Sequence, residues 1–282
     1  MPDSSSNNDG YLVAIGGAED KETDLEVLSR VFELAPAGET EVCIIATASG
    51  IPDEVLPVYA DVFTRLGATQ VHSLPVQERA EAAEEANIEA VRRSGIVFLT
   101  GGDQLRLTNI LGGSALLKAI REHYADGGVI AGTSAGAVAQ STTMIYNGGA
   151  ADALRKGAVK MSSGLGFVEG LIIDSHFLER GRFTRLMEVG ATNPEHLGIG
   201  LGEDAGVIVH RNRVLEAIGS GHVIVVDSRD LASSNVTELS IGEPVAIENV
   251  IMHALISGHG FDIDARKYLG PEDLASRLES AA

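Results

Sequence analysis

The sequence contains little cysteine and no long hydrophobic run, and each absence excludes a class of protein. Cys43 is the only cysteine among 282 residues, so disulfide scaffolds and cysteine-rich metal sites are excluded. It lies in an apolar run, where a small buried core residue is expected. No stretch of about 18 apolar residues occurs, and residues 1–10 lack the basic-then-apolar pattern of a signal peptide. We therefore expect a cytoplasmic protein without a membrane partner, whose residues 1–10 are disordered.

Positive charge is also scarce. The chain has 21 lysines and arginines against 40 aspartates and glutamates, which gives a formal net charge of −19. This excess of negative charge repels nucleic-acid phosphates, so we expect no nucleic-acid partner. It is compatible with cationic substrates, although simple solubility or a saline habitat explains it equally well.

Two kinds of binding motif are missing as well. No H-E-x-x-H motif or clustered histidine and cysteine spacing occurs, so the sequence predicts no metal site. No G-x-G-x-x-G fingerprint follows the first predicted strand, where Gly16 and Gly17 are interpreted as only a turn. We therefore expect no cofactor.

Short apolar runs alternate with amphipathic stretches through the first half of the chain. Apolar strands separated by amphipathic helices are typical of a mostly parallel sheet that is covered on both faces. The pattern therefore predicts an α/β fold with a three-layer α/β/α sandwich. Strands are predicted at 11–15, 41–47, 69–74, 95–100 and 128–131, and helices at 23–35, 53–66, 79–93 and in the stretch that ends at 124.

The pattern changes after Gly148, where a Gly-rich and weakly periodic connection extends to Gly166. Short turn sequences join the last three predicted strands, which indicates an antiparallel extension at the sheet edge. No linker is long enough to force a second domain, so residues 11–282 are expected to form a single domain. The elements predicted here are strands at 171–173, 206–210, 214–218 and 223–226 and helices at 182–189 and 271–280.

A serine follows the strand at 128–131 in the pattern G-x-S-x-G. Gly132 and Gly136 stand two residues on either side of Ser134. Such glycines permit the strained turn that exposes a nucleophilic hydroxyl at the end of a strand. We interpret the turn as a nucleophile elbow, in which the positive helix end and the Ala135 N–H stabilise an oxyanion. An ordinary glycine-serine turn is the alternative.

A glycine pair follows the preceding strand. Loops after neighbouring parallel strands emerge at the same sheet edge, so Gly101 and Gly102 can bring a second N–H toward Ser134. The next residue, Asp103, is expected to cap a helix, and the two roles are compatible.

A serine hydrolase also needs a base, and eight histidines are available. His176 follows an apolar strand and precedes three arginines, so it lies at a strand end, where α/β proteins build their sites. A carboxylate should orient the imidazole, and Asp174, Glu203 and Asp204 are all candidates. Guanidinium groups bind carboxylates bidentately, so arginines near the base favour a substrate rich in carboxylates.

Four segments resemble the motifs of cyanophycinases. They are TGGDQLRL at 100–107, AGTSAGA at 131–137, IIDSHFLERGRFTRL at 172–186 and LGIGLGEDAGVIV at 197–209. Cyanophycinases are serine peptidases related to aspartyl dipeptidase (peptidase E), with a fold similar to that of class I glutamine amidotransferases. The resemblance runs in register from about Tyr11 to the region of His253.

The resemblance implies hydrolysis of cyanophycin, a poly-aspartate backbone with arginine on each β-carboxyl, to β-Asp-Arg dipeptides. It implies a triad of Ser134, His176 and Glu203 and also a homodimer. The backbone N–H groups of Gly102 and Ala135 are expected to form the oxyanion hole. The implied substrate-binding positions are Gln104, Asp174, Ser175, Arg180, Arg182 and Arg185, and Asp103 joins Asp174 as a candidate to pair with the substrate's arginine.

Two departures leave the substrate open. Ser175 stands where cyanophycinases usually have glutamine, and LGEDAG at 201–206 replaces their usual IDEDTA. A serine exopeptidase that forms an acyl-enzyme is the predicted activity. A related peptidase for short aspartyl or isoaspartyl peptides is the first alternative, and a non-catalytic binding member of the fold is the second. A glutamine amidotransferase would need cysteine at the elbow, where the chain has Ser134.

Overall fold

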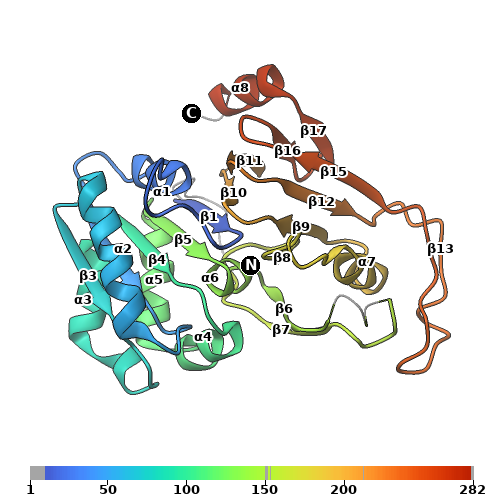
Figure 1. The fold of residues 1–282 in the computed structure, drawn as a ribbon, viewed down its shortest axis with the longest axis horizontal. Helices are drawn as coiled ribbons and strands as arrows, with labels where there is room; N and C mark the ends of the chain where they lie inside the picture. The colour runs from blue at the N-terminus through green and yellow to red at the C-terminus, as the bar shows by residue number, and fades with distance from the viewer. Residues whose placement is uncertain (1–9, 150–151, 153, 212, 281–282) are drawn as a thin grey trace, which may run out of the picture.

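The computed structural model describes residues 10–149, 152, 154–211 and 213–280 (Figure 1). Residues 1–9, which belong to the segment predicted to be disordered, lie outside the described residues. Gly10, the last residue of that segment, is instead buried, and its N–H donates to the Tyr124 carbonyl over 2.7 Å. A Cβ atom at Gly10 would lie 1.6 Å from the Gly128 carbonyl oxygen, so this close approach requires a glycine.

The strands predicted in the first half form the parallel side of a nine-stranded sheet. Their order is β1-β5-β4-β2-β3, and each neighbouring pair is parallel. All except the edge strand β3 are almost fully buried, because helices cover both faces of the sheet. The strands are β1 (Tyr11–Ile15), β2 (Glu41–Ile45), β3 (Gln70–Leu74), β4 (Ile96–Leu99) and β5 (Val129–Thr133).

Helices cover the two faces of this sheet and complete the predicted sandwich (Figure 1). Val13 and Ile15 of β1 pack with α1 and α2, whereas the alternate residues Leu12 and Ala14 belong to the core cluster that contains α3, α4 and α5. Cys43 is fully buried in the latter cluster, as predicted. The helices are α1 (Glu26–Glu33), α2 (Pro52–Leu66), η1 (Glu81–Ala83), α3 (Glu85–Arg93), α4 (Gln104–Leu111) and α5 (Ala115–Ala125).

The antiparallel extension is confirmed for two of the three strands assigned to it. β10 (Ala205–Val209) pairs with β1 and with β11 (Val214–Gly219), and β16 (Gly260–Asp262) and β17 (Lys267–Leu269) complete this edge. The third strand, β12 (Val223–Asp227), does not continue the sheet, because Gly219, with a φ of +87°, opens a turn that redirects the chain.

β12 instead belongs to a four-stranded sheet in the order β15-β12-β9-β8. Helix α7 (Phe183–Thr192) packs on it, and Gly198 of β9 allows Leu186 of that helix to approach the strand. A single apolar cluster contains residues of both sheets, so the two sheets share a core. The other strands of this sheet are β8 (Leu171–Asp174), β9 (Leu197–Leu201) and β15 (Ile251–Leu255).

Smaller elements complete the chain. The connection predicted at 148–166 contains β7 (Lys160–Ser163), which pairs antiparallel with β6 (Thr143–Asn147). The strands β13 (Ser233–Ser234) and β14 (Ile247–Glu248) form an arm at the edge of the molecule (Figure 1), and α8 (Pro271–Glu279) ends the described chain. In the ranges given above, no helix is long and apolar enough to cross a membrane.

Candidate active site

Ser134 stands at the sharp turn between β5 and the short helix α6 (Ala135–Val138). Its φ of 50° and ψ of −108° are strained for a residue with a side chain, and such strain costs on the order of 1–3 kcal/mol. A Cβ at Gly132 would lie 2.4 Å from the Gly136 carbonyl oxygen, and one at Gly136 would lie 2.3 Å from that of Leu99. Both glycines are therefore needed for the turn, which has the geometry of a nucleophile elbow.

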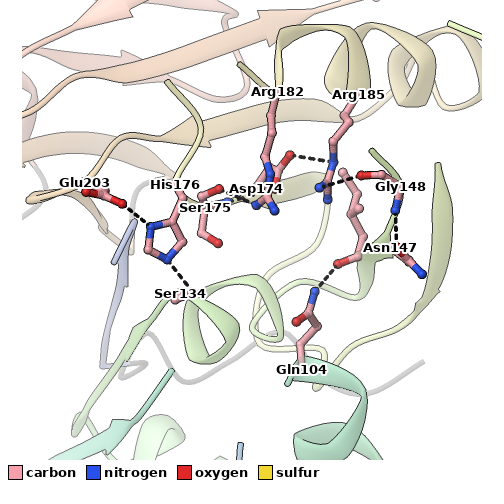
Figure 2. A network of polar contacts seen from close by, with 11 residues as sticks. Gln104, Ser134, Asn147, Gly148, Asp174, Ser175, His176, Arg182, Arg185 and Glu203 are labelled. Atoms are coloured by element: carbon pink, nitrogen blue, oxygen red, sulfur yellow. Dashed lines mark hydrogen bonds and ion pairs between the residues drawn. The ribbon is translucent and has the colours of Figure 1, made fainter. Parts of the chain in front are cut away.

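His176 and Glu203 complete a linear hydrogen-bonded set with Ser134 (Figure 2). The Nε2 atom of His176 lies 3.1 Å from the Ser134 Oγ, and its Nδ1 atom lies 2.7 Å from the Glu203 Oε1. With a proton on Nδ1, the imidazole donates to the carboxylate and accepts from the serine hydroxyl. This is the arrangement in which a histidine acts as a general base.

The other two candidate carboxylates are engaged elsewhere. Asp174 accepts the Ser175 N–H and pairs with Arg182. Asp204 accepts the Asp20 N–H and the Ser220 hydroxyl. The geometry therefore favours Glu203 as the carboxylate that orients His176.

The glycine pair after β1 is more than a turn, which corrects our sequence interpretation. The carbonyl oxygens of Ile15 and Gly16 accept the N–H groups of Ser134 and His176, each over 2.9 Å, and the Gly17 carbonyl accepts that of Asp204 over 3.0 Å. One short loop therefore fixes the main chain at or beside all three members of the set. A glycine pair directly after a central strand was the available signal, but its partners lie far away in sequence.

Gly17 also lies against the histidine ring. Its φ is +107°, and a Cβ there would lie 2.5 Å from the His176 Nε2 atom. A side chain at this position would therefore displace the imidazole that contacts Ser134.

Two backbone N–H groups close to Ser134 in the chain or in the site have no hydrogen-bond acceptor among the described residues. A Cβ at Gly101 would lie 3.4 Å from the Ser134 Cβ, so the loop after β4 runs beside the elbow, as predicted. In the described part of the chain, neither the Gly102 N–H nor the Ala135 N–H has a hydrogen-bond acceptor. Asp103 caps α4 by accepting the N–H groups of Leu105 and Arg106, as predicted for a cap.

A small polar hollow lies on one side of Ser134, and we call it the arginine pocket. Its volume is about 180 Å³. It contains all the predicted substrate-binding residues except Asp103, namely Gln104, Asp174, Ser175, Arg180, Arg182 and Arg185. The structure therefore brings together residues that the sequence separates by up to about eighty positions.

Asp174 is the centre of the arginine pocket (Figure 2). Its side chain is 1% exposed, and its two oxygens lie 3.2 Å from Arg182 Nη1 and 3.2 Å from Arg185 Nε. Burial raises the pKa of the Asp174 carboxyl, and the two guanidinium groups oppose that rise. Burial likewise lowers the pKa of both arginines, and the negative charge of Asp174 works against this lowering. With Arg180 added, three cations share one anion, so the pocket suits an anionic ligand group.

The remaining residues of the arginine pocket have defined partners. Gln104 Nε2 donates to the Ile145 carbonyl over 2.9 Å, and Arg185 Nη1 donates to that of Gly148 over 3.1 Å. Ser175 is buried beside them, and its carbonyl accepts from Arg182. Arg180 is exposed and, among the described residues, has no ion-pair partner.

A second and larger hollow lies on the other side of Ser134, and we call it the helix cleft. Its volume is about 600 Å³. One wall is the first part of α2, and the loop that begins at Gly17 forms another. Sequence reasoning did not find this cleft, because its residues come from several distant segments. The residues that line it include Glu19, Lys21, Ile51, Glu54, Val55 and Val58.

No group of three or more histidine, cysteine, aspartate or glutamate side chains able to hold a metal ion occurs in the described ranges.

The model of peptidase family S51 matches residues 12–217, which include the whole of this set. The chain belongs to peptidase family S51. Membership makes it a serine peptidase, in agreement with the geometry at Ser134. The match extends from β1 into β11 and therefore spans both sheets.

Curated S51 relatives are similar over nearly the whole chain. A cyanophycinase from Synechococcus elongatus is 33% identical over 92% of this chain and 80% of its own length. A cyanophycinase from a Nostoc species is 36% identical over 92% of this chain and 87% of its own length.

A solved structure shares the fold. The crystal structure of a peptidase from an acI-B1 actinobacterium matches with a TM-score of 0.64 and 21% identity, covering 90% of this chain and 97% of the other. The predicted α/β fold class is thereby confirmed.

Proposed function

We propose that this S51 peptidase hydrolyses cyanophycin and releases β-Asp-Arg dipeptides. The observation that carries the proposal is the position of the arginine pocket, which lies beside the Ser134–His176–Glu203 set and offers excess positive charge. Cyanophycin has a poly-aspartate backbone, and its arginyl units carry further carboxylates. The small volume of this pocket suits the end of a chain, which supports an exopeptidase.

In the proposed reaction, Ser134 is the nucleophile and His176 the base. The imidazole Nε2 takes the hydroxyl proton while Oγ attacks the carbonyl carbon of an aspartyl peptide bond. The N–H groups of Gly102 and Ala135 stabilise the tetrahedral oxyanion. The imidazolium, stabilised by Glu203, then protonates the leaving amine as the C–N bond breaks, and an acyl-enzyme ester remains. Water, deprotonated by His176, hydrolyses this ester and regenerates Ser134.

The pocket residues have separate roles in this proposal. Arg180 is the unpaired cation, so it binds a substrate carboxylate directly. Arg182 and Arg185 are paired with Asp174, so they fix the pocket's shape and contribute positive charge. Asp174 is surrounded by its arginines and is not free to bind the substrate's guanidinium, which weakens that earlier candidate role. Asp103 stays a helix cap in this scheme, since it lines neither hollow.

Incubation with insoluble cyanophycin, followed by mass spectrometry of the soluble products, tests the proposal. We expect β-Asp-Arg dipeptides from the native protein and none from Ser134→Ala. Activity confined to short aspartyl or isoaspartyl peptides would instead establish the first alternative, and would show that the polymer is not the substrate.

A serine-directed acylating reagent tests the non-catalytic alternative. We expect it to label the native protein and to leave Ser134→Ala unlabelled. A native protein that resists labelling and hydrolyses neither class of peptide would be a binding member of the fold.

The resemblance also supports one further proposal, a homodimer. Light scattering of the purified chain measures its mass in solution directly. A mass equal to the 29.5 kDa of one chain would contradict the dimer.

A further inference from the structure

The helix cleft has an apolar wall on α2. Ile51, Val55 and Val58 follow one another at helical spacing and line the cleft on one face of the helix. Ile51 is 54% exposed and Val58 is 46% exposed, so both present apolar surface to the cleft. Apolar surface gathered in a hollow beside a nucleophile is typical of a ligand site.

Ile51 occupies a position where another residue would stabilise the helix better. It is the N-cap of α2 and makes no side-chain hydrogen bond to the helix end. Serine, threonine, aspartate and asparagine are favoured at this position, because their side chains can accept a hydrogen bond from the helix end, and isoleucine cannot. A role in ligand contact accounts for an exposed apolar residue at this position.

The charges of the helix cleft divide into a paired and an unpaired set. Glu19 is buried, and its carboxylate accepts the hydroxyls of Tyr59 and Thr133 over 2.5 and 2.7 Å. The Lys21 ammonium lies 3.1 Å from the same carboxylate, so these two charges compensate each other.

The unpaired set consists of Glu54 and Arg180. Both are exposed, and neither has an ion-pair partner among the residues described. Arg180 also lines the arginine pocket, so it stands where the two hollows meet. The cleft therefore offers a ligand one free anion, one free cation and an aliphatic wall.

We propose that the helix cleft binds an arginine side chain of the substrate, with Glu54 as the group that selects it. The inference rests on the proposed function and adds a specificity residue to it. An arginyl unit has a three-carbon stem and a guanidinium group. Its stem packs on Ile51 and Val58, and its guanidinium pairs with the Glu54 carboxylate. Arg180 binds a carboxylate of the bound substrate.

Ligand binding to Ser134→Ala tests the inference without turnover. The probes are a synthetic trimer of aspartyl units that carry arginine and the same trimer with citrulline, which replaces guanidinium by neutral urea. We expect calorimetry to give about fivefold tighter binding of the arginyl trimer, as for a partly exposed charge pair. Adding Glu54→Gln should abolish that preference.

Asp53→Asn is the matched control, because it removes the same charge from the same helical turn outside the cleft. Added to the Ser134→Ala protein, Asp53→Asn should keep the preference for the arginyl trimer. The thermal unfolding midpoints of the Asp53→Asn and Glu54→Gln variants should be equal. If the Glu54→Gln and Asp53→Asn proteins prefer the arginyl trimer over the citrulline trimer to the same degree, the inference is overturned. Equal binding of the two trimers, or no binding of the arginyl trimer, would also overturn it.

Hydrolysis by the native protein separates the two proposals. If the native protein releases dipeptides from cyanophycin but Ser134→Ala binds both trimers equally, the proposed function is supported and the role of Glu54 is wrong. If binding of the arginyl trimer is preferred and the preference depends on Glu54, but no dipeptide is released, the cleft assignment is supported and the proposed function is wrong.

Discussion

The two hollows that flank Ser134 are held in shape by different means. The arginine pocket is built from charged side chains that pair with one another, with Asp174 buried between Arg182 and Arg185. On the helix-cleft side, the carbonyl groups of residues 15–17 accept main-chain hydrogen bonds from Ser134, His176 and Asp204. Loss of the Asp174 charge should therefore disturb the arginine pocket, whereas a side chain added at Gly17 should displace the His176 ring.

Gly17→Ala should have the largest effect, because its new methyl group would collide with the His176 ring. A misplacement of about 1 Å at a catalytic group can reduce the rate about a hundredfold, and we expect a fall in kcat of that order with a smaller change in KM. Steady-state kinetics on an aspartyl peptide or the polymer would measure it.

Gly38→Ala is the control for that substitution. Gly38 also has a positive φ, +86°, and a Cβ there would meet nothing within 4 Å. It carries the same backbone strain without the collision, so kcat should stay near the native value. An equal loss of kcat in both variants would attribute the effect to general destabilisation.

Asp174→Asn should have the next largest effect, mainly on stability and KM. The substitution leaves the buried Arg185 and the partly buried Arg182 without their counter-charge, which costs about 3 kcal/mol. We expect a lower thermal midpoint and a raised KM. A variant with native stability would show that the arginines find other partners, and that side-chain pairing does not hold the pocket.

Ile51→Ser should have the smallest effect and the opposite sign in stability. Loss of apolar contact in the cleft should raise KM for the arginyl polymer about twofold to threefold, because roughly half of this side chain is already exposed. Serine at the N-cap should also stabilise α2 by about 1 kcal/mol.

Ile241→Ser is the control, since Ile241 is 83% exposed and lies outside the cleft. It should leave KM unchanged. If Ile51→Ser also leaves KM unchanged, the apolar wall of the cleft does not contact the substrate.

Much of this site could be predicted from the sequence because its signals are local. The glycines on either side of Ser134 predict the nucleophile elbow. His176 and Glu203 each lie next to the end of a predicted strand, and this position places them at one edge of a sheet. Periodicity could not choose among the three candidate carboxylates, because the choice depends on side-chain partners such as those of Asp174. The family resemblance selected Glu203, and the 2.7 Å contact with His176 agrees with that selection.

The features that the sequence did not reveal depend on long-range pairing. The apolar run of β12 is compatible with either sheet, and only its antiparallel partners β9 and β15 decide the matter. The loop at Gly16 and Gly17 contacts residues more than a hundred positions away. The helix cleft is assembled from the Gly17–Lys21 loop, the start of α2 and the elbow, and no single segment carries its pattern.

The position of Glu203 has a consequence for how the protein acquires its activity. This residue lies between β9 of the four-stranded sheet and β10 of the nine-stranded sheet, whereas Ser134 follows β5 of the latter. During synthesis, a chain that has emerged only as far as β8 has its serine but neither the orienting carboxylate nor β10 against β1. The growing chain therefore cannot bring Ser134, His176 and Glu203 together until β9 and β10 have been synthesised and both sheets have formed.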